Sequence, residues 1–419
     1  MKELLKIKLG ELVDFQTGPF GTQFSASEYV NEGIPVINVK NIGIGTVIRE
    51  NLDYISEQTR DRLSQHILKT GDIVFGRKGS VDRHAYIFQN ENGWVQGSDC
   101  IRARKKTQVN TLFLSQYLEG NGVKKQIINA AVGSTMPSLN TDILKDVIVL
   151  LPNIEEQNRI SEALKKIDDK ICLNSKINDN LEQQAKLLYD YWFTQFDFPD
   201  KSGKPYRSSG GKMVWNEQLK RTVPDGWTTN PLSDILTFKS GYSFSSDLYE
   251  VSGKYKLLTI KNVQNNGINL NVDNYINVLP DNVPDYCLLK AKDILMSLTG
   301  NVGRVGIMYA DNCLLNQRVA LAEPVNINQR VFVYFLLKSD IIHKQYEMIA
   351  NGSSQQNLSP IEAEKVIIAY NSEVATKFST LCSEYLNTIV SNLAENQELI
   401  NMRDWLLPML MNGQATISD

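Results

Sequence analysis

Two long stretches of the chain carry apolar residues at alternating steps of three and four positions. This spacing forms the a/d seam of a coiled coil, and asparagines within both seams favour a fixed register and partner. Two amphipathic helices of an ordinary bundle are the alternative. The seam positions are Leu164, Ile167, Ile171, Asn174, Asn178, Leu181, Ala185 and Leu188 in the first stretch, and Leu386, Ile389, Leu393, Asn396, Ile400, Arg403 and Leu407 in the second.

The order of these stretches along the chain favours the coiled coil. The first leaves one globular region and enters another, and the second follows that other region. Antiparallel pairing of the two helices therefore returns the chain to the first region. A helix of about 38 residues spans roughly 55 Å. We expect two similar heads separated by a rod and related by an approximate two-fold axis.

The two halves of the chain resemble each other at a shift of about 220 positions. LGELVDFQTG at 9–18 matches LSDILTFKSG at 232–241, and VKNI at 39–42 matches IKNV at 260–263. A period this long indicates a duplicated domain rather than a solenoid repeat. Further matched pairs are Asp72 with Asp293, Gly79 with Gly300, Arg83 with Arg304, Gly133-Ser134 with Gly352-Ser353, and Leu139 with Leu358.

Each globular half mixes strand and helix patterns. Short β-branched runs at 35–37, 72–75, 146–150 and 293–296 predict strands, and three-to-four apolar spacing at 110–121 and 329–351 predicts helices. We therefore expect two similar mixed α/β domains with two long antiparallel coiled-coil helices. The predicted boundaries are 1–152 for the first domain, 153–195 for its helix, 196–226 for a connector, 227–371 for the second domain and 372–419 for the last helix.

Composition narrows the class of protein. The 419 residues include 44 Lys and Arg against 47 Asp and Glu, which excludes a strongly basic protein that coats nucleic acid. The 5 Cys and 3 His are scattered without ligand spacing, so we expect no metal site. Reduced thiols, a polar N-terminal segment and the absence of a long apolar run predict a cytoplasmic protein that is not embedded in a membrane.

Motifs for catalysis are missing from the sequence. No P-loop, dinucleotide-binding glycine fingerprint, nucleophile elbow or NPPY-type methyltransferase run occurs in a suitable context. Asp168 and Lys170 supply half of a nuclease pattern, but no Pro-Asp pair precedes them at useful spacing. We therefore predict no catalytic residues and favour a binding protein. Two domains on a rigid spacer would suit the recognition of two short sequences on duplex DNA, whose groove repeats about every 34 Å.

Three segments of the chain resemble regions of type I restriction-modification specificity subunits. LPNIEEQNRISEALKKIDDKI at 151–171, FDFPDKSGKPYRSSGGKMVWNEQL with VPDGW within 196–227, and NQELINMRDWLLPMLMNGQ at 396–414 are similar to the central and distal regions of that family. The second helix departs from the pattern, because NSEVATKFSTL lacks the proline and Glu-Gln pair of the first.

The resemblance implies a non-catalytic subunit with two target recognition domains. Each domain would read one half of a bipartite site in double-stranded DNA, and the helices would bind two modification (methyltransferase) subunits, to which restriction subunits are added. It also implies that S-adenosylmethionine, ATP and magnesium belong to the partner subunits, with no cofactor in this chain. A scaffold that bridges partners and a self-contained DNA-modifying enzyme remain the alternatives.

Candidate DNA contacts follow from side-chain chemistry. Phosphates are bound by cations, hydroxyls and backbone donors, whereas Arg reads guanine and Asn or Gln reads adenine. A glycine-flanked basic loop supplies the first set of candidates, and a second basic cluster, which could also be a solvated surface, supplies more. In the first domain the candidates are Arg77, Lys78, Ser80 and Arg83, then Arg102, Arg104 and Lys105, and in the second domain Ser297, Thr299, Arg304, Gln317 and Arg318.

Two further segments allow either a structural or a binding interpretation. Matched polar loops carry Ser134 and Thr135 in the first domain and Ser353 and Gln355 in the second, and they could contact a DNA groove or form surface turns. An aromatic cluster at 189–198 could pack the end of the first long helix on the second domain or dock a modification subunit.

Overall fold

The computed structural model describes residues 4–133, 137–350 and 356–417. Its contacts divide the chain into a first unit, Met1–Lys170 with Leu399–Asp419, and a second unit, Ile171–Glu398. Each unit has its own apolar core, and each is described separately below.

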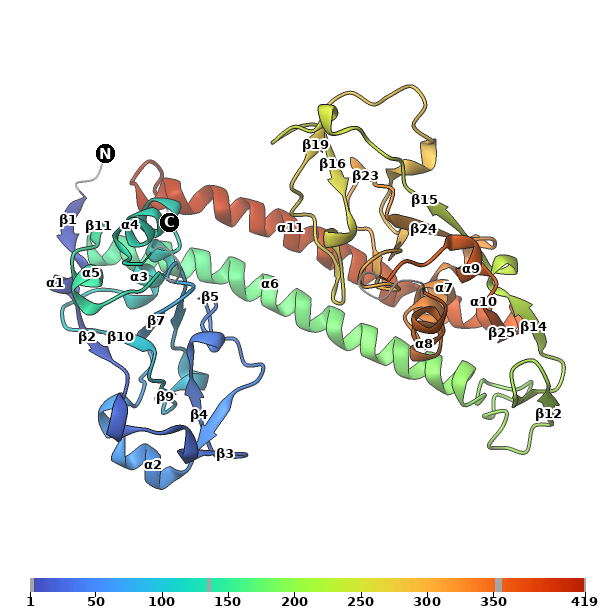
Figure 1. Cartoon of the computed structure of the whole chain (residues 1–419), viewed down its shortest axis with the longest axis horizontal. Helices are drawn as coiled ribbons and strands as arrows, with labels where there is room; N and C mark the ends of the chain where they lie inside the picture. The colour runs from blue at the N-terminus through green and yellow to red at the C-terminus, as the bar shows by residue number, and fades with distance from the viewer. Residues whose placement is uncertain (1–3, 134–136, 351–355, 418–419) are drawn as a thin grey trace. The chain divides into compact units, whose positions relative to one another are not determined.

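Sheets and short helices build the first unit (Figure 1). The five-stranded sheet has the order β2 (Val13–Thr17), β10 (Cys100–Lys105), β7 (Ile73–Gly76), β8 (His84–Tyr86), β5 (Ile44–Gly45), and the four-stranded sheet has the order β3 (Tyr29–Val30), β6 (Asp53–Ile55), β4 (Ile34–Ile37), β9 (Val95–Gln96). Strand β1 (Leu5–Lys8) pairs with β11 (Ile148–Leu151). The helices are α1 (Leu9–Leu12), α2 (Glu57–Arg62), α3 (Thr111–Leu118), α4 (Asn121–Ala130) and α5 (Thr141–Lys145).

The second unit repeats this plan. Strands β15 (Leu236–Ser240), β24 (Val319–Pro324), β21 (Ile294–Ser297) and β22 (Val305–Ile307) form one sheet, and β19 (Tyr275–Ile276), β16 (Tyr255–Leu258), β23 (Cys313–Leu315) and β20 (Leu288–Leu289) form another. Two-stranded pairs are β14 (Thr228–Pro231) with β25 (Ile367–Tyr370), β17 (Val263–Gln264) with β18 (Gly267–Ile268), and β12 (Met213–Asn216) with β13 (Arg221–Pro224). The helices are α7 (Arg330–Leu337), α8 (Asp340–Ile349), α9 (Pro360–Glu364) and α10 (Ser372–Leu381).

The duplication extends to single hydrogen bonds. The buried Asn41 side chain donates to the carbonyl oxygens of Ile48 and Glu50 at 3.1 and 3.3 Å, and Asn262 donates to those of Asn269 and Asn271 at 2.9 Å. A buried amide must be hydrogen-bonded, and here it holds the following turn in shape. These asparagines are the shared Asn of VKNI and IKNV, so the repeat seen in the sequence has a structural cause.

Two long helices carry the predicted seams. They are α6 (Ile154–Tyr189), which continues into a π-helical turn over Asp190–Thr194, and α11 (Ser383–Met411). In the second unit, Asn174 pairs with Asn396, and Asn178 bonds Asn392 and the carbonyl oxygen of Ile389. Partner numbers fall as α6 numbers rise, so the helices run antiparallel there. In the first unit, Arg403 Nη1 lies 3.0 Å from Asp168 Oδ1.

The two long-helix segments begin with different anchors. At the start of α6, Gln157 donates to the carbonyl oxygen of Pro152 at 2.9 Å and accepts from the Asn110 backbone N–H at 3.0 Å. In the second unit the anchoring amide belongs to the globular domain and not to the helical segment. There Gln329 donates to Ser372 and to Thr376 Oγ1 at 3.0 Å. Gln157, the glutamine of the Glu-Gln pair, therefore anchors the start of α6 within its own unit. The second helical segment lacks this glutamine, and Gln329 of the adjoining domain anchors it instead.

The sequence pattern predicted one helix over 329–351, whereas the structure has two helices, α7 and α8, within the described part of that segment. Helix α7 ends at Leu337, and Ser339 starts α8 by accepting from the Ile342 N–H through its hydroxyl. Serine is a favoured N-cap because its oxygen satisfies a free N–H, so the local cap interrupts the apolar periodicity.

The aromatic cluster packs within the second unit. Tyr189 and Phe193 stack at 5.0 Å between centroids, and Phe193 lies 4.8 Å from Phe332 and 5.5 Å from Phe378. Aromatic pairs at these separations stabilise a core beyond their buried area. The packing interpretation of this segment is confirmed.

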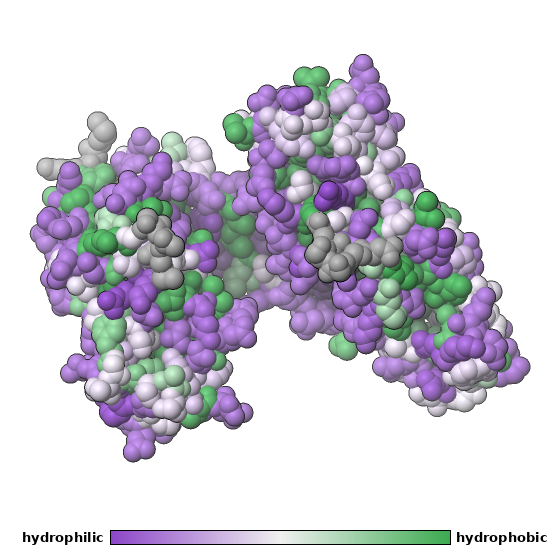
Figure 2. Space-filling view, viewed as in Figure 1, coloured by the Kyte–Doolittle hydropathy of each residue, from purple (hydrophilic) through white to green (hydrophobic). Residues whose placement is uncertain are grey.

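The described ranges contain no helix long and apolar enough to cross a bilayer. The faces visible in Figure 2 carry mostly hydrophilic side chains with scattered apolar residues.

Candidate nucleic-acid interface

The basic loop of the first unit follows β7, a strand buried at all four positions. Lys78 forms a bridge with Ser138, and the Gly79 N–H donates to the carbonyl oxygen of Pro137 at 3.0 Å. Gly79 has φ +79°, which glycine adopts without strain. The loop is therefore fixed by backbone bonds, while its side chains remain available.

Four of the predicted contacts gather on this loop. The Arg77 guanidinium lies 4.8 Å from the ring centroid of Phe20, which is 41% exposed. Lys78 lies 3.6 Å from Asp99, an exposed pair that contributes little to stability. Ser80 and Arg83 are exposed and have no described side-chain partner. The loop thus presents three cations and a hydroxyl, and their DNA contacts remain a prediction.

Arg102 does not reach the surface as the basic run suggested. Its side chain is 7% exposed, Nη1 donates to the carbonyl oxygen of Gln65 at 2.8 Å, and Nη2 bonds Gln16. Burial lowers the pKa of Arg102. Its place on central strand β10 turns the side chain into the protein, so Arg102 is removed from the candidate interface.

Arg104 and Lys105 lie away from the basic loop. Arg104 Nε and Nη2 donate to the two carboxylate oxygens of buried Asp72 at 2.8 and 2.6 Å, a fork geometry that fixes the guanidinium internally. Lys105 is exposed. Both occupy the end of β10 that pairs with Val13 and Asp14, whereas Cys100 at the other end pairs with Gly76 beside the loop. The length of strand β10 therefore separates Arg104 and Lys105 from the basic loop.

The equivalent loop of the second unit uses its hydroxyls internally. Ser297 is buried; its hydroxyl bonds the carbonyl oxygen of Asn301 and accepts from the Arg304 N–H at 3.1 Å. The Thr299 hydroxyl, also buried, donates to Asn357 Oδ1 at 2.9 Å. These two predicted contacts are corrected to loop supports, because neither hydroxyl is presented to solvent.

Arg304 is half-buried beside the same loop. The carboxamide oxygen of Asn301 accepts from its Nη2 and Nη1 at 3.1 and 3.2 Å, in the amide orientation that satisfies both groups. The structure thus holds the Arg304 guanidinium by a neutral partner, and a DNA contact by its remaining donors stays a prediction.

Gln317 and Arg318 are exposed and line a recess of about 540 Å³ together with Thr299 and Asn357. Asn357 ends the matched polar loop 351–357, for which the sequence allows either a groove contact or a surface turn, whereas the nearby Ser240 was not among the predicted contacts. The sequence repeat aligns Asn357 with Ser138, because Leu358 matches Leu139. The structure agrees, since Asn357 forms a bridge with Thr299 as Ser138 does with Lys78. Ser134, Thr135, Ser353 and Gln355 lie outside the described residues.

Equivalent backbone positions carry different charges in the two units. The Arg77 N–H donates to the carbonyl oxygen of Asp99 at 2.8 Å, and the Leu298 N–H donates to that of Arg318 at 3.1 Å. Asp99 therefore corresponds to Arg318, and by the next position Lys78 corresponds to Thr299. At these matched positions the first unit has its cation, Lys78, just after β7. The second unit has its cation, Arg318, just before β24.

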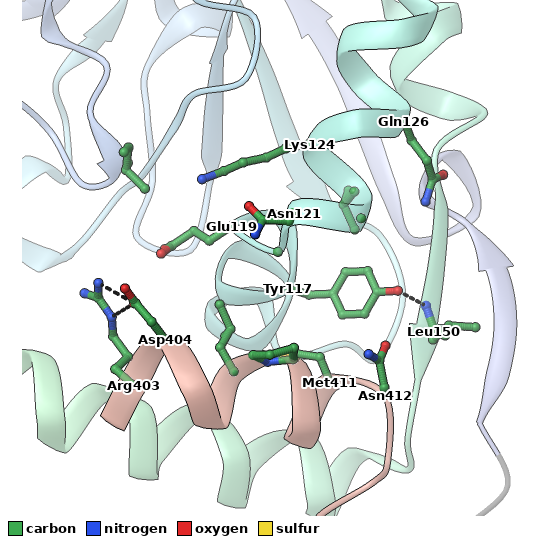
Figure 3. Close-up of a pocket in the computed structure, with 16 residues that line it drawn as sticks. Tyr117, Glu119, Asn121, Lys124, Gln126, Leu150, Arg403, Asp404, Met411 and Asn412 are labelled. Carbon is green, nitrogen blue, oxygen red and sulfur yellow. Dashed lines mark hydrogen bonds and ion pairs between the residues drawn. The ribbon is translucent and has the colours of Figure 1, made fainter. Parts of the chain in front are cut away.

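A separate hollow of about 570 Å³ lies in the first unit against the C-terminal part of α11 (Figure 3). Glu119 projects into it, and Arg403 and Asp404 pair at its edge at 2.9 Å. Burial raises the pKa of Glu119 to about 7, and nearby Arg403 opposes this effect. Tyr117 lies on the other side, where its hydroxyl accepts from the Leu150 N–H at 3.1 Å.

Two diverged copies of one α/β domain, each with a supported loop at a sheet end, define a duplicated two-domain protein. The family model described as type I restriction modification DNA specificity domain matches residues 1–183 and 224–369, and the chain belongs to this family. The predicted fold class, two similar mixed α/β domains with two long coiled-coil helices, is confirmed.

Curated relatives extend over most of the chain. The type I restriction enzyme MjaIX specificity subunit of Methanocaldococcus jannaschii is 27% identical over 407 residues, covering 94% of this chain and 89% of the relative. The HindI specificity subunit of Haemophilus influenzae is 25% identical and covers 83% and 87%. The crystal structure of a type I restriction-modification system S subunit from M. genitalium matches with a TM-score of 0.61 at 18% identity, over 98% of this chain and 96% of that chain, which supports the fold.

Proposed function

We propose that this chain is the DNA specificity subunit of a type I restriction-modification complex, with each unit reading one half of a bipartite duplex target. The observation that carries the proposal is the charge difference on a shared frame. Asp99 in the first unit stands where the second has Arg318, and Lys78 stands where it has Thr299. A common frame with different contact chemistry suits two different half-sites.

The proposed contacts of the first unit are Arg77, Lys78, Ser80 and Arg83. Lys78 and Arg83 are suited to phosphates as exposed cations. Arg77 differs, because stacking on Phe20 limits the orientation of its guanidinium plane. A guanidinium held in one plane can donate two parallel hydrogen bonds to the O6 and N7 atoms of guanine. We assign base reading to Arg77 and positioning to the other residues.

The proposed contacts of the second unit surround its recess. Arg318 and Gln317 are exposed, and Gln and Asn side chains can pair with the N6 and N7 atoms of adenine. Thr299 holds the Asn357 side chain through the oxygen atom, which leaves the Asn357 amide hydrogens for another acceptor. Lys105 in the first unit and Arg304 in the second remain secondary candidates for phosphate contacts.

The helices α6 and α11 are the proposed docking sites for two modification subunits, with restriction subunits added to the complex. Catalysis, S-adenosylmethionine, ATP and magnesium are assigned to those partners, and this chain is assigned no catalytic residue. The scattered thiols and the match to restriction-system relatives support a cytoplasmic location.

A selection experiment tests the proposal. The chain assembled with its modification subunit should enrich one bipartite sequence from random duplexes, and the R318Q variant should change preference only in the half-site read by the second unit. Equal enrichment of all sequences would favour a scaffold that bridges partners without reading DNA. Methylation or cleavage by the isolated chain with cofactors would favour a self-contained enzyme.

A further inference from the structure

The second unit contains a partly open cavity of about 240 Å³ at the C-terminal end of α6. Its walls come from the π-helical turn, from α7 and α8, from β25 and from the start of β13. Most of the wall is apolar, including Ile342 and Ile368. An engineered apolar cavity of roughly 150 Å³ is enough to bind benzene, so this volume can hold a ring with a substituent. The space is called the Arg221 cavity below.

Arg221 brings a cation without a counter-ion to this cavity. Its Nη2 donates to the carbonyl oxygen of Thr194 at 3.0 Å, and its guanidinium lies 4.6 Å from the ring centroid of buried Phe196. No carboxylate of the described residues forms an ion pair with Arg221. Burial lowers the pKa of Arg221, the nearby cation Arg207 lowers it further, and Tyr189 opposes both effects. A half-buried guanidinium is usually paired, so the local potential favours an anion.

A second polar group in the wall is also unused. Gln345 lies at the sixth position of α8, where α4 of the first unit has Gln126. Gln126 accepts from the Ile148 N–H at 3.2 Å, whereas Gln345 forms no hydrogen bond with the described residues. The duplicated position therefore has a structural bond in one unit and a free amide facing a cavity in the other.

The cavity arises partly from one side-chain difference between the units. Ala369 occupies the third position of β25, where β11 of the first unit has Leu150. Both residues line hollows of their units, but a leucine at 369 would occupy space that alanine leaves empty. The A369L variant should therefore reduce the volume of the cavity without changing Arg221.

We propose that the Arg221 cavity binds a small carboxylic acid with an aromatic or branched apolar body. The apolar body would pack against Ile342 and Ile368, and the carboxylate would accept hydrogen bonds from Arg221. A guanidinium has five N–H donors, of which the structure uses one, and its fork matches a carboxylate. The amide of Gln345 would bond the remaining oxygen. This proposal does not rest on DNA reading by either unit.

Methyl NMR of the full chain with labelled isoleucines tests the proposal, with phenylacetate as the probe. Phenylacetate should shift the Ile342 and Ile368 methyl signals saturably, with a dissociation constant of about 10 μM to 1 mM. Neutral phenylacetamide should bind at least about tenfold more weakly, because it lacks the charge that Arg221 would pair.

Two variants separate the charge from the volume. R221Q should weaken phenylacetate binding at least about tenfold and R221K should weaken it less, while A369L should abolish binding with Arg221 intact. Absence of a saturable shift, equal binding of acid and amide, or full binding by A369L would each overturn the proposal. DNA selectivity of the assembled complex is a separate readout, so failure here leaves the proposed function standing.

Discussion

Asn174 donates through Nδ2 to Asn396 Oδ1 at 2.9 Å inside the seam between α6 and α11 of the second unit. Both side chains are buried, and Asn396 also donates to the carbonyl oxygen of Ile171 at 3.3 Å. Polar residues in a coiled-coil seam set the register at a cost in stability. The pair therefore fixes which turns of the two helices meet.

Replacing one member of this pair should destabilise the second unit. N174L leaves the Asn396 carboxamide oxygen buried without its donor, and the expected loss in free energy of unfolding is about 1–3 kcal/mol. Urea unfolding measures the change. N180L, the same substitution at an exposed position of α6, is the matched control and should change stability by less than about 0.5 kcal/mol. An equal loss in both variants would show that the seam pair has no special role.

The ion pair between half-buried Arg104 and buried Asp72 gives a prediction about stability rather than DNA. R104Q leaves a buried carboxylate without its cation, and the expected loss is about 3–5 kcal/mol. K105Q, at the exposed neighbouring position, should be nearly neutral in the same unfolding experiment. A neutral R104Q variant would mean that Arg104 is free for other partners.

Charge removal on the basic loop should weaken DNA binding by the assembled complex. The double variant R77Q/K78Q should bind less tightly, and the slope of log affinity against log salt should fall by about one for each lost phosphate contact. Fluorescence titration over a range of salt concentrations measures this slope. K125Q, an exposed lysine on α4, is the control. An unchanged slope in the double variant would place Lys78 away from the phosphates, and unchanged affinity would place both side chains away from the DNA.

Glu119 should make stability depend on pH. Burial raises its pKa from 4.5 to about 7, so the folded state holds a proton that the unfolded chain releases. Its stabilising contribution is complete below about pH 4.5 and is lost as pH rises through about 7. The free energy of unfolding of E119Q relative to the wild type should therefore rise by about 1–3 kcal/mol from pH 5 to pH 8. Unfolding experiments at both pH values measure the gain, and a difference that is constant with pH would contradict it.

The fold was predictable because its signals are periodic or repeated. The seams of α6 and α11 appear directly in the spacing of apolar residues, and the VKNI and IKNV matches mark asparagines that hold equivalent turns. The break between α7 and α8 was missed, because one serine cap at Ser339 outweighs a continuous apolar pattern.

The candidate interface was predictable only in part, because charge alone does not reveal burial. Arg102 and Arg104 belong to the same basic run as Lys105, but their side chains bond Gln65 and Asp72 inside the first unit. These partners are distant in sequence. The hydroxyls of Ser297 and Thr299 were predicted to face DNA. In the structure they bond Asn301 and Asn357 instead, and the sequence alone does not reveal these partners. Nothing in the sequence indicated that Phe20 lies beside Arg77, and their contact is known only from the structure.

Mapping methylated bases in DNA from cells that express this chain with its modification subunit tests the central claim most directly. Methylation should occur at one bipartite sequence with a fixed spacer, and cells with the modification subunit alone should lack it. The R318Q variant should alter one half of that sequence and leave the other unchanged. Methylation at the same sites without this chain, or at sites without a bipartite pattern, would contradict the account.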